Sequence, residues 1–209
     1  MNNKKMKLVV GILYLSLVVL GPIGFMVLPE QFNVVNVNEF ASENLGLIGA
    51  WIFVDILIIT VEVFISVYLY RILREHNEKF ALATSATRFA VVAIMVVNTV
   101  FLLITLFSGG SNADTFIEYH NSGVFVWQLP FSVHVVLLGI MAMKYTRSKW
   151  KYLGIALILG GLGYLLDSIQ HLGNIESSVF GTISMVLLVF VMIGEIGIAI
   201  GLLLNKVWE

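Results

Sequence analysis

The sequence contains no cysteine among its 209 residues. Disulfide bonds, thiolate nucleophiles and cysteine-ligated zinc or iron–sulfur sites are therefore excluded. Any metal site in this chain would have to take its ligands from His, Asp and Glu.

Charged residues are also scarce. They make up 12% of the chain, while 59% of the residues are hydrophobic and the mean hydropathy is +0.96. A soluble domain has about 25% charged residues, and so few charges could not cover this much apolar surface in water. Membrane lipids are therefore the expected surroundings. The net charge of -1 provides no basic excess for binding nucleic acid.

Six long apolar stretches account for the hydropathy. They lie near residues 8–28, 46–70, 81–105, 124–144, 152–171 and 180–204. Each has the length of about 20 residues that a membrane-spanning helix needs. Backbone groups in lipid must hydrogen-bond within their own segment, and the short alternating segments of a barrel are missing. The sequence predicts an all-α fold, a single domain of six transmembrane helices over residues 1–209.

Lysine and arginine are distributed unevenly over the predicted loops. All of them except Arg88 fall on one side: Lys4, Lys5, Lys7, Arg71, Arg74, Lys79, Lys144, Arg147, Lys149, Lys151 and Lys206. The other loops contain no Lys or Arg, and their charged residues are all acidic. Basic loops stay in the cytoplasm, so both termini are expected there, in a bacterial plasma membrane. The first span is longer than the usual apolar region of a signal peptide and no A-x-A-like site follows it, so it is expected to be a membrane span and not a cleaved leader.

Three ionisable residues are predicted to lie at one level in the inner half of the membrane. At about 1.5 Å per residue, Glu62, Arg88 and Glu195 all lie about 4–7 Å to the cytoplasmic side of the midplane. Arginine binds carboxylates through a planar fork, so a buried ion pair is expected. The pair could serve only to fix helix register. Alternatively, one guanidinium cannot neutralise two carboxylates, and the second could carry a proton.

A second, outer group of polar residues is predicted nearer the other face. It comprises Asp55, Asn98, His134, Asp167 and His171, with His120 in the adjacent loop. Asp167 and His171 are four residues apart on one helix face, and Asp55 shares a helix face with Glu62. The second span therefore links the two groups.

The outer group raises the question of a metal ion. Asp55, His134, Asp167 and His171 carry donors that zinc accepts. However, no H-E-x-x-H or comparable motif is present, and His134 and His171 differ in depth by about 15 Å. Hydrogen-bonded core roles are the alternative, and no cofactor is predicted beyond a divalent metal at this group.

Other motifs are less specific. Gly197 and Gly201 form a G-x-x-x-G pair, which allows close helix packing and could support a homodimer. The four tryptophans lie near the predicted span ends, where belt anchoring is expected. Neither a phosphate-binding glycine loop nor a nucleophile elbow is present, so the sequence does not favour an enzyme.

With these residues in view, the chain resembles a known family over about residues 8–204. The resemblance is carried by GILYLSLVVLGPIGF at 11–25, the second span with Asp55 and its ending YLYRILRE, RFAVVAIMVVN from Arg88, the stretch 134–168 that includes His134 and Asp167, and GEIGIAIGLLL with Glu195. The family is domain of unknown function 4386, small bacterial membrane proteins. The resemblance implies a six-helix membrane protein and supplies no activity.

Three functions remain open at this stage. The first is a transport or membrane-stress accessory protein with a polar core, for which the Gly21-Pro22 pair is a candidate helix break. The second is an intramembrane metal-dependent hydrolase of a lipid-like substrate. The third is a non-catalytic immunity or regulatory module that binds another membrane protein.

Overall fold

The computed structural model describes residues 2–147 and 149–208, and within them it contains helices and no strand. The helical elements are α1 (Asn3–Pro22), the π-helix η1 (Ile23–Val27), α2 (Leu28–Glu30), α3 (Val37–Glu43), α4 (Leu45–Leu73), α5 (Glu78–Phe107), α6 (Ala113–Tyr145), the 3-10 helix η2 (Lys149–Tyr152), α7 (Leu153–Leu172) and α8 (Ser178–Leu203). Six helical stretches are long and apolar enough to cross a membrane. The predicted all-α membrane bundle is confirmed.

Polar side chains cap the first turn of several of these helices. Asn77 accepts a hydrogen bond from the backbone N–H of Phe80 at the start of α5, and Ser177 accepts one from Phe180 at the start of α8. Such caps satisfy donors that a helix leaves free in its first turn. The Gly21-Pro22 pair is followed by the π-helical turn η1, because proline disturbs the regular hydrogen-bond pattern.

The fourth spanning helix begins much earlier than predicted. α6 starts at Ala113, whereas the apolar stretch begins near 124. The additional turns are amphipathic: Ala113, Ile117 and His120 are buried, while Asp114 is exposed. A hydropathy window misses such a segment because its mean is lowered by the polar face. His120 therefore lies on a helix, and its predicted position in a loop is wrong.

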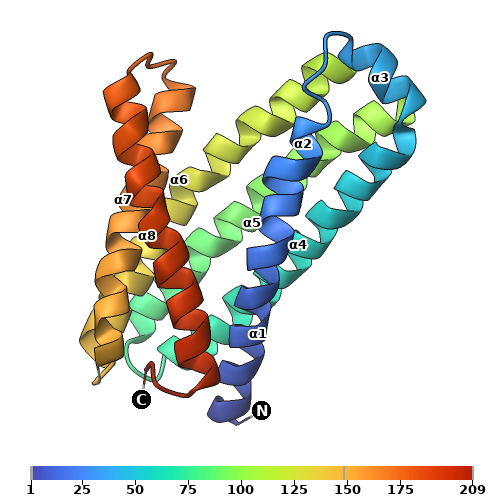
Figure 1. Cartoon of the computed structure of the whole chain (residues 1–209). Coiled ribbons are helices and arrows are strands. Elements are labelled where there is room, and N and C mark those ends of the chain that lie inside the picture. Colours follow the sequence, from blue (N-terminus) through green and yellow to red (C-terminus); the bar gives the residue numbers. More distant parts are fainter. Residues whose placement is uncertain (1, 148, 209) are drawn as a thin grey trace.

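The six long helices form a closed ring. α1 packs against α4, and the ring continues through α5, α6, α7 and α8, which returns to α1. Figure 1 shows both termini at the same end of the bundle. We call this the basic end, since the helix ends and loops there carry the lysines and arginines other than Arg88. We call the opposite end, with loops at 31–36, 108–112 and 173–177, the acidic end, since the charged residues in and beside these loops are acidic.

Helix α7 approaches its neighbours through glycines. A Cβ added at Gly163 would lie 2.9 Å from backbone atoms of α8, and one at Gly161 would lie 2.9 Å from the carbonyl oxygen of Ser132 on α6. Gly197 faces Leu153, and Gly201 faces Val207 and Trp150. The expected close packing occurs within the chain, and the homodimer through Gly197 and Gly201 stays a prediction.

Helices α1 and α8 meet only near the basic end. A Cβ added at Gly11 would lie 2.9 Å from the carbonyl oxygen of Ala199. Towards the acidic end, α1 and the α7–α8 pair diverge into a V (Figure 1). The ring of helices therefore begins to open about one helical turn beyond the α1–α8 crossing.

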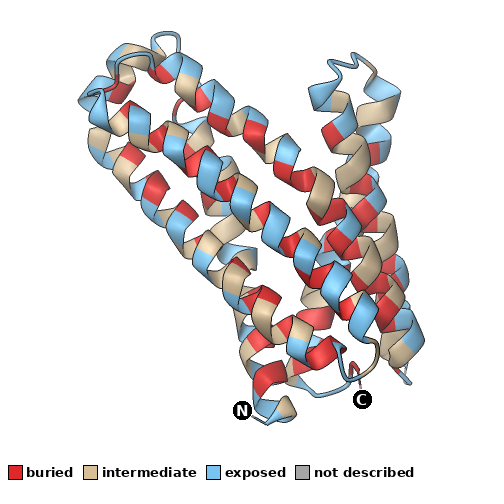
Figure 2. Ribbon diagram, turned by 180° about the vertical axis from the view of Figure 1, so that it is seen from behind, coloured by how far each residue is buried: buried red, intermediate tan, exposed pale blue. Residues whose placement is uncertain are grey.

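The core is concentrated in the half of the bundle nearest the basic end, where Val10, Leu73, Met141 and Leu202 belong to one buried cluster. Exposed side chains cover much of the outer faces of the helices (Figure 2), as expected where lipid is the solvent. Trp51, Trp127 and Trp208 are buried, with at most 8% of each residue exposed. The expected role of these tryptophans as belt anchors is therefore wrong, and they pack inside the bundle.

Candidate functional site

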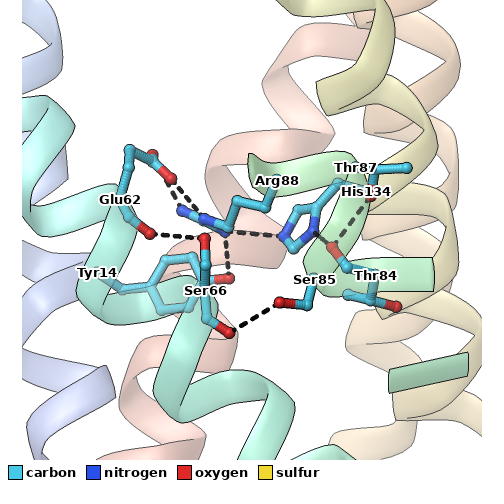
Figure 3. Close-up of polar contacts among 8 residues, drawn as sticks. All are labelled: Tyr14, Glu62, Ser66, Thr84, Ser85, Thr87, Arg88 and His134. Atoms are coloured by element: carbon cyan, nitrogen blue, oxygen red, sulfur yellow. Dashed lines mark hydrogen bonds and ion pairs between the residues drawn. The ribbon is translucent and has the colours of Figure 1, made fainter. Parts of the chain in front are cut away.

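Arg88 lies at the centre of the bundle and binds Glu62 through two hydrogen bonds. The Arg88 Nε is 2.5 Å from Glu62 Oε2, and Nη2 is 3.0 Å from Oε1. Figure 3 shows the fork formed by these two bonds. Arg88 has no exposed surface and Glu62 has 6%. Buried charges require such paired and hydrogen-bonded geometry. The buried ion pair predicted from helix depth is thus formed by Arg88 and Glu62.

The third nitrogen of the guanidinium contacts two further helices. Arg88 Nη1 donates to the Tyr14 hydroxyl at 2.8 Å and lies 2.8 Å from His134 Nε2. The rings of Tyr14 and Phe131 lie 5.0 and 5.6 Å from the guanidinium carbon, close enough for cation–π attraction. Every nitrogen of Arg88 therefore has a partner within the bundle.

The contacts of His134 define its tautomer. Its Nδ1 lies 2.8 Å from the carbonyl oxygen of Thr84. Because a carbonyl can only accept, Nδ1 carries the proton. Its Nε2 faces the Arg88 N–H group and therefore accepts, so the imidazole is neutral and serves as a hydrogen-bond acceptor for the guanidinium.

His134 belongs to this central group, and its predicted place in the outer group is wrong. The physical reason is the true length of α6. Since α6 runs from Ala113 to Tyr145, its middle lies near residue 129. His134 is then about 7 Å towards the basic end at 1.5 Å per residue, which is the level of Arg88.

Glu195 lies beside the ion pair without joining it. Within the described part of the chain it forms no salt bridge, although it interacts electrostatically with Arg88, Glu62, Tyr14 and Tyr164. Its residue surface is partly exposed. Glu195 is four residues before Ala199, so it sits one turn beyond the α1–α8 crossing, where the V begins.

The central group takes one polar residue from each of the six long helices. They are Tyr14, Glu62, Arg88, His134, Tyr164 and Glu195, on α1, α4, α5, α6, α7 and α8 respectively. The two tyrosines and His134 were not assigned to this group from the sequence. Tyrosine and histidine near the middle of a span were the available signal, since their polar atoms require partners in lipid.

The outer group is reduced to a small cluster around Asp55. His120 Nε2 lies 2.9 Å from Asp55 Oδ2, and the Thr99 hydroxyl is 3.2 Å from the same oxygen. The edge of Trp51 packs on the His120 ring with centroids 4.7 Å apart. Asp55 Oδ1 and His120 Nδ1 are buried and have no hydrogen-bond partner among the described residues. His120 thus takes the position expected for His134.

The remaining outer residues lie apart. Asp167 and His171 approach each other on α7, with Oδ1 and Nδ1 3.5 Å apart, and the His171 ring stacks on Phe125 at 3.8 Å. Asn98 is 6% exposed, and its side chain packs against Gly123 on α6. Asp167, His171 and Asn98 form no ion pair or hydrogen bond with Asp55 in the part of the chain that the structure describes.

These positions do not favour the predicted metal site. Asp55, His134 and the Asp167–His171 pair occupy three separate places, and the described residues include no group of three or more His, Asp or Glu that could hold a metal ion. An intramembrane zinc site needs at least three protein ligands around one ion. The residues predicted for the metal-dependent hydrolase are thus not brought together around one ion in the described residues.

An apolar layer separates the central group from the Asp55 cluster. Ile58 lies between Asp55 and Glu62 on the same face of α4, and Met95 and Trp127 occupy the corresponding levels of α5 and α6. All three belong to the buried cluster of the basic half. The two polar groups are thus neighbours along α4, about 10 Å apart at 1.5 Å per residue, with apolar side chains between them.

One family model matches this chain. It is described as Domain of unknown function (DUF4386), and the match covers residues 9–205. Comparisons with curated proteins and with solved structures find no match.

Proposed function

Because the chain belongs to the family described as Domain of unknown function (DUF4386), we propose its function from the geometry of the central group: a multi-pass membrane carrier that exchanges a proton at Glu195. We further propose that the basic end faces the cytoplasm of a bacterial plasma membrane. The support for this orientation is the concentration of lysine and arginine in the helix ends and loops at that end.

The observation that carries the proposal is the presence of two carboxylates for one guanidinium. Glu62 accepts hydrogen bonds from Nε and Nη2 of Arg88. Tyr14 and His134 bind the remaining nitrogen, Nη1. Glu195 is left near the same charge without a hydrogen bond to it. A carboxylate in this position is costly as an anion, so the cost favours taking up a proton.

The difference in exposure between the two carboxylates supports separate roles. Glu62 is enclosed with Arg88, while Glu195 is partly exposed at the start of the V. A group that exchanges a proton or solute must be reachable, whereas a register-fixing pair need not be. We assign the Arg88–Glu62 pair to structure and Glu195 to exchange.

Proton movement in pyranine-loaded proteoliposomes tests the proposal. A potential is imposed with potassium and valinomycin, without solute and then with a panel of amino acids, sugars and organic cations. Wild-type protein should change the lumenal pH under at least one condition, and Glu195→Gln should reduce the change to that of empty liposomes. Glu176→Gln, an exposed glutamate in the loop between α7 and α8, is the matched control. Equal traces for wild type and Glu195→Gln would contradict the proposal.

The non-catalytic module remains a second candidate because of one observation. Every nitrogen of Arg88 is satisfied within the chain, as expected of a pair that only fixes helix register. This alternative predicts that Glu195→Gln changes stability but no measurable flux, and the same proteoliposomes separate the two.

A further inference from the structure

We infer that the solute exchanged for the proton at Glu195 is a lipophilic organic cation without N–H donors, such as a phosphonium or quaternary ammonium ion. The inference rests on the proposed proton exchange and adds the chemical class of the ligand. It is argued from the charge, the aromatic walls and the surroundings of Glu195.

The charge comes from Glu195 alone. The buried Arg88 is already satisfied by Glu62, Tyr14 and His134, so the ion pair has no capacity to bind an anion. When Glu195 is ionised, its carboxylate is the group at this level that lacks a hydrogen-bonding partner in the described residues. A cation is therefore the complementary ligand.

A chain of aromatic rings extends from Tyr164 towards the acidic end. Phe131 and Tyr164 have ring centroids 5.1 Å apart in an edge-to-face arrangement, Trp127 lies 5.7 Å from Phe131, and Phe25 lies 5.4 Å from Trp127. Tyr164 interacts electrostatically with Glu195 and is partly exposed. An aromatic ring beside a carboxylate is the chemistry that recognises quaternary ammonium and similar cations.

The scarcity of free polar groups near Glu195 determines which cations are favoured. A primary amine brings three N–H donors and needs several acceptors, but the Tyr14 hydroxyl and His134 Nε2 already accept from Arg88, which leaves the Tyr164 hydroxyl beside the carboxylate. A cation without N–H donors needs none. The site therefore selects by charge and by apolar contact.

The exposed surface of α1 and α8 at this level is apolar as well. Beyond the α1–α8 crossing, the diverging helices expose Val18 on α1 and Met192 on α8, with 40% and 61% of their surfaces exposed. Figure 1 shows the V opening towards the acidic end. Glu195 is itself partly exposed, and the solvent at this level of a membrane is acyl chains, so a ligand that partitions into the bilayer can reach the carboxylate.

The exchange step involves no covalent change in the ligand. In the proton-loaded state Glu195 is a neutral carboxylic acid. When the cation enters, the O–H bond breaks, the carboxylate keeps the electron pair, and the proton leaves to water. One positive charge replaces another at Glu195, so the charge of the buried group stays constant.

Calorimetric titration of the nanodisc-reconstituted chain with tetraphenylphosphonium tests the inference, with triphenylphosphine oxide as the neutral analogue. Wild-type protein should bind the cation, release about one proton into weak buffer, and bind the neutral analogue at least about tenfold more weakly. Glu195→Gln should remove this proton release and weaken cation binding at least about tenfold. Glu195→Asp, which keeps the charge, should retain proton release.

A second variant separates the aromatic wall from general effects on folding. Tyr164→Leu should weaken tetraphenylphosphonium binding about tenfold, and Tyr164→Phe, which keeps the ring, should weaken it less. Tyr152→Leu, at a tyrosine exposed on the surface, should bind as wild type does.

The possible failures are distinguishable. Absence of tetraphenylphosphonium binding, or equal binding by wild type and Glu195→Gln, overturns the cation inference. If a different solute of the panel still drives Glu195-dependent proton movement in proteoliposomes, only the ligand class is wrong. If no condition moves protons, the proposed carrier fails as well.

Discussion

Arg88 is the residue on which the contacts of the central group converge. It joins α5 to α4 through Glu62, to α1 through Tyr14 and to α6 through His134. These bonds are buried, so each partner depends on the others. Removing the guanidinium leaves Glu62 buried as an unpaired carboxylate.

Arg88→Ala should lower the free energy of unfolding by about 3–5 kcal/mol, because the partner of a buried charge is lost. Unfolding in detergent, followed by circular dichroism, measures the change. Arg71→Ala, at an exposed arginine near the end of α4, is the control. The double variant Arg88→Met with Glu62→Met should recover part of the loss, since no charge remains unpaired. Wild-type unfolding of Arg88→Ala would show that the pair contributes little.

Asp55 makes the corresponding contacts in the outer cluster. Asp55→Ala should reduce the free energy of unfolding by about 1–3 kcal/mol, because the buried His120 and Thr99 lose their common acceptor. The same unfolding assay applies, with Asp114→Ala at an exposed position of α6 as the control. If Asp55→Ala abolished proton movement while leaving stability unchanged, the cluster would need a functional role instead of a structural one.

At the level of elements, the packing of α7 depends on its glycines. The backbone of α8 occupies the space that a side chain at Gly163 would need, so the two helices can approach only with glycine there. α8 also carries Glu195, and its distance from α7 therefore affects the position of the carboxylate.

Gly163→Ala should destabilise the bundle by about 1–3 kcal/mol, because an added methyl group overpacks a helix contact made by backbone. Gly49→Ala on α4 is the matched control, since a Cβ there would meet nothing within 4 Å. Thermal unfolding in detergent compares the two. Equal melting temperatures would mean that α8 can move away from α7 at little cost.

For the whole molecule, the natural absence of cysteine makes the orientation directly measurable. Lys5→Cys at the basic end and Ser111→Cys at the acidic end place single thiols at exposed positions. In intact bacterial cells, a membrane-impermeant maleimide should label Ser111→Cys, and Lys5→Cys should react only after the membrane is opened. The reverse pattern would place the basic end outside and contradict the positive-inside assignment.

The sequence by itself determined the architecture and part of the site. Six apolar runs of sufficient length specify six helices, because backbone groups in lipid have no partner outside their own helix. Burying a charge is costly, and this singled out Glu62, Arg88 and Glu195 in the sequence. Their common level in the membrane follows from the constant rise of a helix. The loops likewise predicted which end is basic.

The tertiary structure decided which of these residues bind one another. Depth along a helix says nothing about direction around it until the ring order is known, so only the fold shows that Arg88 pairs with Glu62 and leaves Glu195 apart. It also moved His134 to the central group and His120 to Asp55, because α6 begins with amphipathic turns that mean hydropathy does not detect. The V between α1 and α8 depends on where helices cross, which is set by packing between segments distant in the sequence.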